Sequence, residues 1–392
     1  MLVELSVFTL ILLALAIGWW LGSKEKNRRP PSSLANFQLN NEYFTALNNL
    51  LNEQPDAAIE AFSKALEINS ATVETHLALG SLFRKRGESE KAVRLHQNLF
   101  ARPCLTKEQT LQVQLELAKD FLAAGLLDRA ENLLTELSSK NFKYRQASQV
   151  LLLELYEKQQ DWQQALSVLS LDLLRTQPKY RLAASNYCCE LASQHLAANN
   201  PSQARKLLKQ ALGYNPNCVR SSLLNAQLEL DNDNPKAALR YLNRVPEQDP
   251  SQVPLILTPL LAAYAQLNKP KKLLANLTSL AENHSFTSLA LALAKHLEAA
   301  GKPQEALNSL LNHLQGYPSL KGLEALLKLY LNQATGLEKN HLLNLKHLTS
   351  QLLAQKANYQ CTECGFASQQ HFWLCPKCRN WASHKPLDSL EG

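Results

Sequence analysis

Four cysteines near the C-terminus form two Cys-x-x-Cys pairs, a spacing at which thiolates hold metal ions. Cys361 and Cys364 make the first pair, and Cys375 and Cys378 make the second. Two thiolates two residues apart can grip one ion from a tight turn, and a second pair completes the tetrahedron that zinc prefers. Because all four positions are thiolates, no ligand position is left for water. The pattern therefore predicts one structural metal ion rather than a catalytic one.

Three alternatives to a zinc site follow from the same four cysteines. Iron is the main alternative to zinc, because four thiolates also suit a single iron and Cys-Pro-x-Cys, present at 375–378, occurs in rubredoxin-type knuckles. Two disulfides would need an oxidising compartment, which the topology argued below disfavours. A redox pair of the thioredoxin kind would follow a strand, and no strand pattern precedes either pair. Zinc stays favoured, with iron open.

Charge and composition argue against nucleic acid as a partner. The chain has 392 residues, a net charge of +7 and 45% hydrophobic residues, which indicates an ordered protein of more than one domain. Residues 358–392 carry equal numbers of basic and acidic side chains: Lys377, Arg379 and Lys385 against Glu363, Asp388 and Glu391. A nucleic-acid-binding ribbon would need a basic face to neutralise phosphates.

The N-terminus has the pattern of a membrane anchor. Residues 5–21 carry no charge, and the apolar run extends to about 20 residues, enough to cross a bilayer. Glu4 precedes the run and KEKNRR follows it, which favours an uncleaved anchor whose C-terminal side faces the cytoplasm. We expect an anchor at 1–23 with Trp19 and Trp20 at the headgroup boundary, then a basic linker at 24–33.

Residues 34–318 repeat a helix-turn-helix pattern about eight times, and this predicts an all-α superhelix of tetratricopeptide repeats. Each unit has a small residue, a polar turn and a second small residue twelve positions later, so that two helices can approach closely. Successive second members are 34, 38, 35, 39, 34, 36 and 32 residues apart. The aligned pairs are Ala46/Ala58, Gly80/Ala92, Ala118/Ala130, Leu153/Ala165, Ala192/Ala204, Ala226/Ala238, Ala262/Leu274 and Ala294/Ala306.

The fourth and seventh units are degenerate, because Leu153 and Leu274 replace small residues, and we expect altered packing there. Residues 319–357 keep helical periodicity at 320–331 and 337–357 without the repeat pattern, which is typical of capping helices. Residues 358–392 form the metal ribbon. Their aromatic residues exceed what so short a segment can bury within itself, so the ribbon is predicted to pack on the final helices.

No arrangement of residues indicates catalysis, and the chain is predicted not to be an enzyme. Cys188 and Cys189 with His195 are the only nucleophile-like group, and nothing supplies an orienting group or an oxyanion site. These two cysteines, with Cys104 and Cys218, are expected to be core residues. A repeat superhelix instead offers a concave surface for protein partners. Its candidate partner-binding residues are Glu74, Arg84, Lys85 and Lys119.

The order of anchor, repeats and ribbon resembles the lipopolysaccharide assembly protein B (LapB) family of Gram-negative bacteria. The resemblance covers essentially the whole chain and rests on GWWLGSK at the end of the anchor, repeats such as LGSLFRKRGESEKAVRLHQNL and FLAAGLLDRAENLL, and the ending YQCTECGF…FWLCPKCRNW…KPL. It implies a single-pass protein of the inner membrane whose bulk faces the cytoplasm. The metal ligands of the family match the four ribbon cysteines one for one.

The resemblance also implies a regulatory role. LapB proteins lower lipopolysaccharide synthesis by helping the membrane protease FtsH degrade the deacetylase LpxC, so FtsH, LpxC and other lipopolysaccharide-assembly proteins are the implied partners. Two alternatives stay open. The chain could be a scaffold that gathers lipopolysaccharide synthesis or transport enzymes without directing proteolysis, or, with iron in the ribbon, an electron carrier. Whether it forms a homo-oligomer is also open.

Overall fold

The structure is a computed structural model that describes residues 19–20, 73–103, 105–140, 142–333 and 335–387. The predicted anchor, the linker and the Ala46/Ala58 repeat lie outside these residues, except for Trp19 and Trp20, which are exposed. Among the described helices, none is both long enough and apolar enough to cross a membrane. The chain divides into two compact units, at residues 1–133 and 134–392, and each is described by itself.

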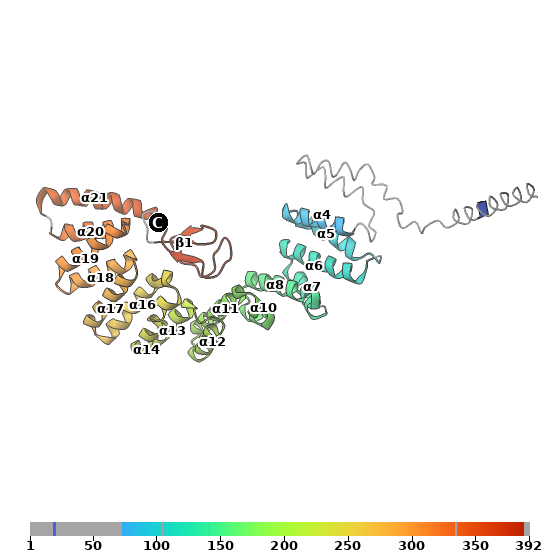
Figure 1. The fold of residues 1–392 in the computed structure, drawn as a ribbon, viewed down its shortest axis with the longest axis horizontal. Coiled ribbons are helices and arrows are strands. Elements are labelled where there is room, and N and C mark those ends of the chain that lie inside the picture. The colour runs from blue at the N-terminus through green and yellow to red at the C-terminus, as the bar shows by residue number, and fades with distance from the viewer. Residues whose placement is uncertain (1–18, 21–72, 104, 141, 334, 388–392) are drawn as a thin grey trace, which may run out of the picture. The chain divides into compact units, whose positions relative to one another are not determined.

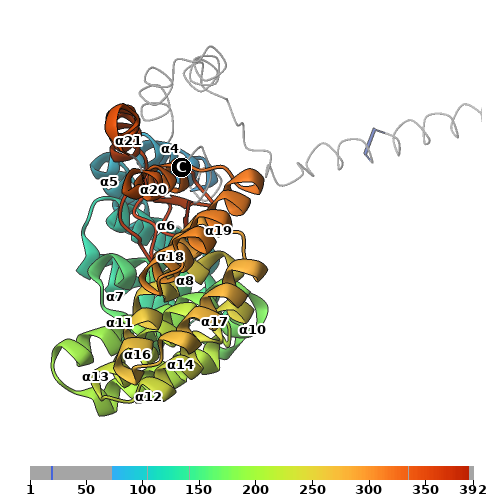
Figure 2. The same cartoon turned by 90° about the vertical axis from the view of Figure 1, so that its left-hand side faces the viewer.

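Antiparallel helices make up most of the described residues of both units (Figures 1 and 2). The first unit contains α4 (Val73–Lys85), α5 (Ser89–Phe100), α6 (Lys107–Ala123) and the start of α7 (Leu127–Lys140). The second contains α8 (Phe142–Gln159), α9 (Trp162–Val168), α10 (Leu171–Thr176), α11 (Pro178–Ala197), α12 (Pro201–Tyr214), α13 (Val219–Asp231), α14 (Pro235–Leu242), α15 (Val245–Gln248), the 3₁₀ helix η1 (Pro250–Ile256), α16 (Leu257–Leu267), α17 (Pro270–Asn283), α18 (Thr287–Ala299), α19 (Pro303–Gly316), α20 (Leu320–Gln333) and α21 (Gly336–Ala354).

The same turn joins the two helices of every described repeat. A residue one or two positions after the first helix is left-handed, at Gly87, Gly125, Gln160, Asn199, Asp233, Asn268 and Gly301. The next residue donates its N–H to the carbonyl five positions back, as Glu88 does to Phe83 at 2.9 Å and Lys302 to Leu297 at 3.0 Å. This bond satisfies a carbonyl that the ended helix leaves free. In four turns a proline then starts the second helix, at Pro201, Pro235, Pro270 and Pro303.

The small residues lie where the paired helices touch. Ala92, Ala118, Ala130, Ala192 and Ala204 are 0% exposed, as the repeat pattern predicts. In the second unit the core runs continuously from α13 through α19 and reaches α20, so each helix pair buries its apolar face against the next.

The register predicted for the seventh repeat is wrong by one residue. Ala262 is exposed, whereas Leu273 is 5% exposed and lies five residues after the left-handed Asn268, where the other repeats place their second small residue. The pair is therefore Leu261 and Leu273. The sequence contained the signal, because Asn268 and Pro270 align with the turn residues of the neighbouring repeats.

The fourth repeat departs from the pattern in its second helix. Helix α9 ends at Val168, Leu169 is extended, and Ser170 caps the separate helix α10 by accepting the N–H of Leu173 at 3.3 Å. Leu153, which replaces the small residue here, is 3% exposed. Helix α8 therefore faces a short, broken partner.

Helices α20 and α21 follow the last repeat. Helix α20 packs on the core through Leu329, while α21 leaves Leu345, Leu348 and Leu352 more than half exposed.

The ribbon is a three-stranded antiparallel sheet of order β2-β1-β3. The strands are β1 (Tyr359–Cys361), β2 (Ala367–Ser368) and β3 (His384–Pro386). Tyr359 is paired with Ser368 on one side and Pro386 on the other. His384 is fully buried, and the rings of Tyr359, Phe366, His371 and Phe372 surround it. In Figure 1 the second unit's helices follow an arc, and the ribbon lies on its inner side.

Candidate metal centre and its seat on the repeats

The two Cys-x-x-Cys pairs lie on two turns of matching geometry. In the first turn, Cys361 donates its N–H to the carbonyl of Phe366 at 2.8 Å, and in the second, Cys375 donates to Asn380 at 3.0 Å. The residue after each second cysteine is left-handed, with φ of 71° at Gly365 and 56° at Arg379. The sequence supplies a glycine for the first of these positions only, so Arg379 holds a conformation that side chains disfavour.

The four sulfurs are arranged as one metal ion requires. They lie within 4.8 Å of one another, with Cys361 Sγ 3.6 Å from Cys378 Sγ and Cys364 Sγ 3.7 Å from Cys375 Sγ. A tetrahedron with zinc–sulfur bonds of about 2.3 Å has edges of about 3.8 Å, whereas a disulfide needs about 2.05 Å. The donor set therefore fits one ion held by four thiolates.

Electrostatics also favour a cation here. Burial opposes ionisation of Cys361, but its hydrogen bond with Ser383 and those from the backbone N–H groups of Cys364 and Glu363 outweigh it and lower its pKa to about 6. Burial and the three neighbouring sulfurs together raise the pKa of Cys378 to about 12, although the N–H of Asn380 acts to lower it. Four thiolates at this spacing repel one another, and a central cation removes that cost.

The ribbon is seated on the middle of the second unit. Trp381 makes edge contacts with Trp162 and Tyr187, with ring centroids 5.8 Å apart in both cases. Its indole N–H donates to Glu157 Oε1 at 2.9 Å, and the hydroxyl of Tyr187 donates to the same oxygen at 2.6 Å. Arg379 donates to the backbone carbonyl of Glu157 at 3.1 Å. Burial, followed by the charge of Glu157, raises the pKa of Tyr187, so its hydroxyl stays a donor.

A second set of contacts holds the other side of the ribbon. Lys385 forms an ion pair with Asp249. Burial acts to raise the pKa of Asp249, but the bond to Lys385 outweighs burial, so this pKa is lowered. The guanidinium of Arg220 lies 5.7 Å from the ring centroid of Trp373. The predicted packing on the final helices is therefore wrong in its target. Among the described hydrogen bonds, Gln369 donates to the carbonyl of Ala354 at the end of α21 at 3.2 Å. The aromatic contacts are instead with α9, α11 and α13.

A cavity of about 890 Å³ opens between the ribbon and the helices. Its walls come from α8, α11, the start of α13, η1 and ribbon residues 377–385. Apolar and aromatic side chains, including Leu153, Tyr180 and Trp381, line it beside charged groups. The cavity is thus formed jointly by the repeats and the metal-bearing ribbon.

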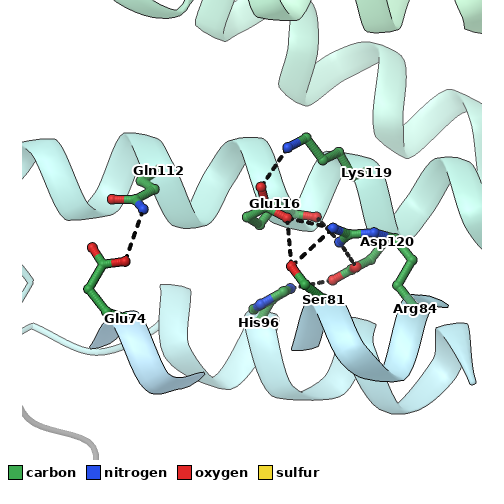
Figure 3. Close-up of polar contacts among 8 residues, drawn as sticks. All are labelled: Glu74, Ser81, Arg84, His96, Gln112, Glu116, Lys119 and Asp120. Carbon is green, nitrogen blue, oxygen red and sulfur yellow. Dashed lines mark hydrogen bonds and ion pairs between the residues drawn. The ribbon is translucent and has the colours of Figure 1, made fainter. Parts of the chain in front are cut away.

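The predicted partner-binding residues of the first unit lie on α4 and α6; Arg84 of α4 is engaged with α6, and Lys119 is engaged within α6 (Figure 3). Arg84 pairs with Glu116 at 2.7 Å and Asp120 at 2.5 Å, and Lys119 pairs with Glu116 at 2.6 Å. Burial opposes ionisation of Glu116, but hydrogen bonds from Lys119 and Arg84 outweigh it and lower its pKa.

The other two candidates are free of such ion pairs among the described residues. Glu74 is exposed and accepts a hydrogen bond from Gln112 at 3.4 Å, and Lys85 is exposed. For all four side chains, partner binding stays a prediction.

The nucleophile-like group lies in the core. Cys188 and Cys189 are 0% exposed, and Cys189 Sγ is 3.8 Å from the Sγ of Cys218, which is 3% exposed. Burial raises the pKa of Cys188 to about 12, so its thiol is protonated at neutral pH. Cys104 lies outside the described residues.

Sequence reasoning missed the residues that receive the ribbon, namely Glu157, Trp162, Tyr187 and Asp249. Their contacts join residues up to 224 positions apart, and no local pattern marks such pairs. The one usable signal was the surplus of aromatic residues in the ribbon.

Comparisons with known proteins agree with this architecture. Family models described as tetratricopeptide repeats match residues 73–191 and 195–267, and one described as a rubredoxin metal binding domain matches residues 359–386. Lipopolysaccharide assembly protein B of Escherichia coli strain K12 is 32% identical over 390 residues, covering 98% of this chain and 99% of that protein. The chain belongs to the lipopolysaccharide assembly protein B family.

A second member of this family, from Haemophilus influenzae, is 33% identical over 395 residues and covers 98% of both chains. Among solved structures, a tetratricopeptide repeat protein from Parabacteroides merdae covers 66% of this chain and 98% of its own, at 17% identity and a TM-score of 0.32. In the present family member, the four clustered cysteines of the rubredoxin-type ribbon are suited to one metal ion.

Proposed function

We propose that this chain is a non-catalytic adaptor in lipopolysaccharide assembly, with Cys361, Cys364, Cys375 and Cys378 holding a structural zinc ion. Support comes from its family, whose members are named for lipopolysaccharide assembly, and from its repeats, an architecture that binds other proteins through extended surfaces. The observation that carries the proposal is the seat of the ribbon on α8, α9, α11 and η1. Through that seat, the helices of the second unit and the metal module form one joint surface.

More specifically, we propose that the chain is an adaptor that presents a client protein to a protease. An N-terminal anchor at residues 1–23 holds the chain at the cytoplasmic face of the inner membrane beside the protease FtsH, and the repeats and ribbon hold the deacetylase LpxC. Confinement to one membrane raises the effective concentration of the bound client near the protease. Degradation of LpxC then limits lipid A synthesis.

The lifetime of LpxC in cells tests this form. Removing the chain should lengthen the half-life of LpxC several-fold, and the wild-type chain should restore it. The Cys361→Ser variant should insert in the membrane yet fail to restore the half-life, because the ribbon cannot fold without its metal. If loss of the chain impairs lipopolysaccharide assembly while the LpxC half-life is unchanged, the scaffold function is correct instead.

Metal analysis separates the zinc adaptor from an electron carrier. Purified chain should contain one zinc per molecule and be colourless. One iron per molecule with the visible absorption of a ferric tetrathiolate would contradict the zinc assignment.

A further inference from the structure

The cavity between the ribbon and the helices has unpaired positive charges on three separate elements. Six basic and four acidic side chains line it. Three of the six are engaged: Lys385 with Asp249, Arg220 with Glu190 at 2.8 Å, and Arg379 with the carbonyl of Glu157. Among the residues that the structure describes, the remaining three form no ion pair and are exposed. They are Lys158 at the end of α8, Lys179 at the start of α11 and Lys377 in the ribbon.

The wall behind these lysines is apolar and offers buried acceptors. Leu153, Tyr180 and Trp381 contribute apolar surface. Asn186 and Gln252 also line the cavity, each is 1% exposed, and in the described part of the chain neither amide oxygen has a hydrogen-bond partner. A buried acceptor without a donor costs free energy, so a ligand that brings N–H groups is favoured here.

These features together select one class of ligand. We propose that this cavity binds an extended acidic segment of a partner protein, whose carboxylates pair with Lys158, Lys179 and Lys377 and whose apolar side chains cover the cavity wall. A peptide main chain supplies the N–H donors that a phosphate lacks. The cations that form no ion pair among the described residues are all lysines, of which Lys179 lies 4.8 Å from the ring centroid of Tyr180. The two arginines, whose forked guanidinium suits phosphate, are engaged with Glu190 and with the carbonyl of Glu157.

The proposal deepens the adaptor function and rests on it only in taking the segment to belong to a client. It also makes binding metal-dependent, because residues 377–385 of the ribbon form one wall. Loss of the metal unfolds that wall while the helical wall remains.

Fluorescence anisotropy with a labelled octapeptide tests the site directly. The probe alternates aspartate with leucine or alanine, and a matched peptide carries lysine in place of aspartate. The zinc-loaded full chain, in mild detergent, should bind the acidic peptide and not the basic one, with an affinity that falls as salt rises. The double variant Lys158→Gln/Lys179→Gln should bind about fivefold more weakly, as expected for two exposed ion pairs.

The control changes the same residue type elsewhere. Lys206 and Lys209 are exposed on α12 and do not line the cavity, so Lys206→Gln/Lys209→Gln should bind like the wild type. Chelating the zinc should abolish binding. Equal binding of both peptides, equal weakening by both double variants, or unchanged binding after chelation would each overturn the proposal.

A last arm addresses anionic lipid. Phosphatidylglycerol vesicles should bind wild type and Lys158→Gln/Lys179→Gln alike. If vesicle binding depends on these lysines and the acidic peptide does not bind, the site recognises a lipid headgroup and the proposal is wrong. Because every measurement uses purified chain, a negative result leaves the LpxC half-life test of the adaptor function unaffected.

Discussion

At the scale of single residues, Arg379 combines two roles. Its left-handed backbone, with φ of 56°, closes the second metal turn, and its side chain donates to the carbonyl of Glu157 at 3.1 Å. Gly365 closes the first turn without a side chain. The left-handed conformation of Arg379 costs about 1 kcal/mol, and the same residue makes a long-range contact. Arg379 therefore links metal binding to docking.

Replacing Arg379 separates these roles. Arg379→Gly should keep or tighten zinc binding, because glycine adopts the left-handed conformation freely, while loosening the ribbon from α8. Arg379→Ala should loosen the ribbon equally but bind zinc more weakly than Arg379→Gly by about 1 kcal/mol. Competition with a chromogenic chelator measures the first effect, and hydrogen exchange in α8 measures the second. Equal zinc affinity in the two variants would show that this backbone conformation carries no cost.

His371 gives the ribbon a defined pH dependence. Burial, together with the charges of His384, Lys385 and Arg220, lowers its pKa to about 4, although its Nε2–H donates to the carbonyl of His384 at 3.0 Å, which acts to raise it. A lowered pKa means that the unfolded state takes up the proton first. The contribution of neutral His371 to ribbon stability is therefore fully present above about pH 6.5, and it is lost as the pH falls from there towards 4.

The variant His371→Phe tests this contribution, because it keeps a ring in the same place without a titrating group. Urea unfolding of the ribbon, followed by tryptophan fluorescence at saturating zinc, should show a smaller loss of stability between pH 7 and 5 in the variant than in the wild type. Parallel losses would assign the pH dependence to other groups.

At the scale of helices, the first unit shows why a repeat position holds glycine rather than alanine. A Cβ built on Gly80 would lie 2.3 Å from the ring of His96. His96 is fully buried and hydrogen-bonds through Nδ1 to Asp120, which in turn pairs with Arg84. The close approach of α4 to α5 thus depends on a missing methyl group, and it places His96 beside α6.

Gly80→Ala should therefore destabilise the first unit by about 1–2 kcal/mol, because overpacking outweighs the gain in helix propensity. Gly213→Ala is the control: it lies in α12, and its Cβ would meet nothing within 4 Å. That change should stabilise its unit by up to about 1 kcal/mol. Denaturant melts followed by circular dichroism measure both, and a stabilising Gly80→Ala would contradict the packing described here.

At the scale of the whole second unit, the ribbon is a structural partner of the repeats. Trp381 is 7% exposed and touches two aromatic residues that lie on different helices, α9 and α11. Because α9 is short and followed by a break, its helix pair has less internal packing than its neighbours. The ribbon covers this weak point.

Trp381→Ala should undock the ribbon and destabilise α8, α9 and α11 by about 3 kcal/mol or more, while zinc binding persists because Trp381 is not a ligand. Trp381→Phe keeps most of the ring contact and loses only the bond to Glu157, so its cost should be about 1 kcal/mol. Hydrogen exchange localises the effect. Deleting residues 359–392 should loosen the same helices, and unchanged protection there would contradict docking.

The repeats, the metal-ligand pattern and the turns between helices can be predicted from the sequence alone. These features depend on residues close in the chain: small residues twelve apart, cysteines two apart, and Asn, Asp or Gly before the second helix. The off-by-one register at Leu261 and Leu273 was an error of alignment, since Pro270 already marked the turn. Interactions between residues that are close in the chain leave patterns in the sequence, and these patterns can be recognised without knowledge of the fold.

The position of the ribbon on the helices follows from the folded structure and not from any local pattern. Trp381 meets Glu157 across 224 residues of chain, and Lys385 meets Asp249 across 136. The curvature of the stacked helices brings these partners together, and that curvature is the sum of small packing angles at every repeat. The surplus of aromatic residues in the ribbon indicated a contact. The site of that contact, and the cavity beside it, depend on a geometry that no single segment contains.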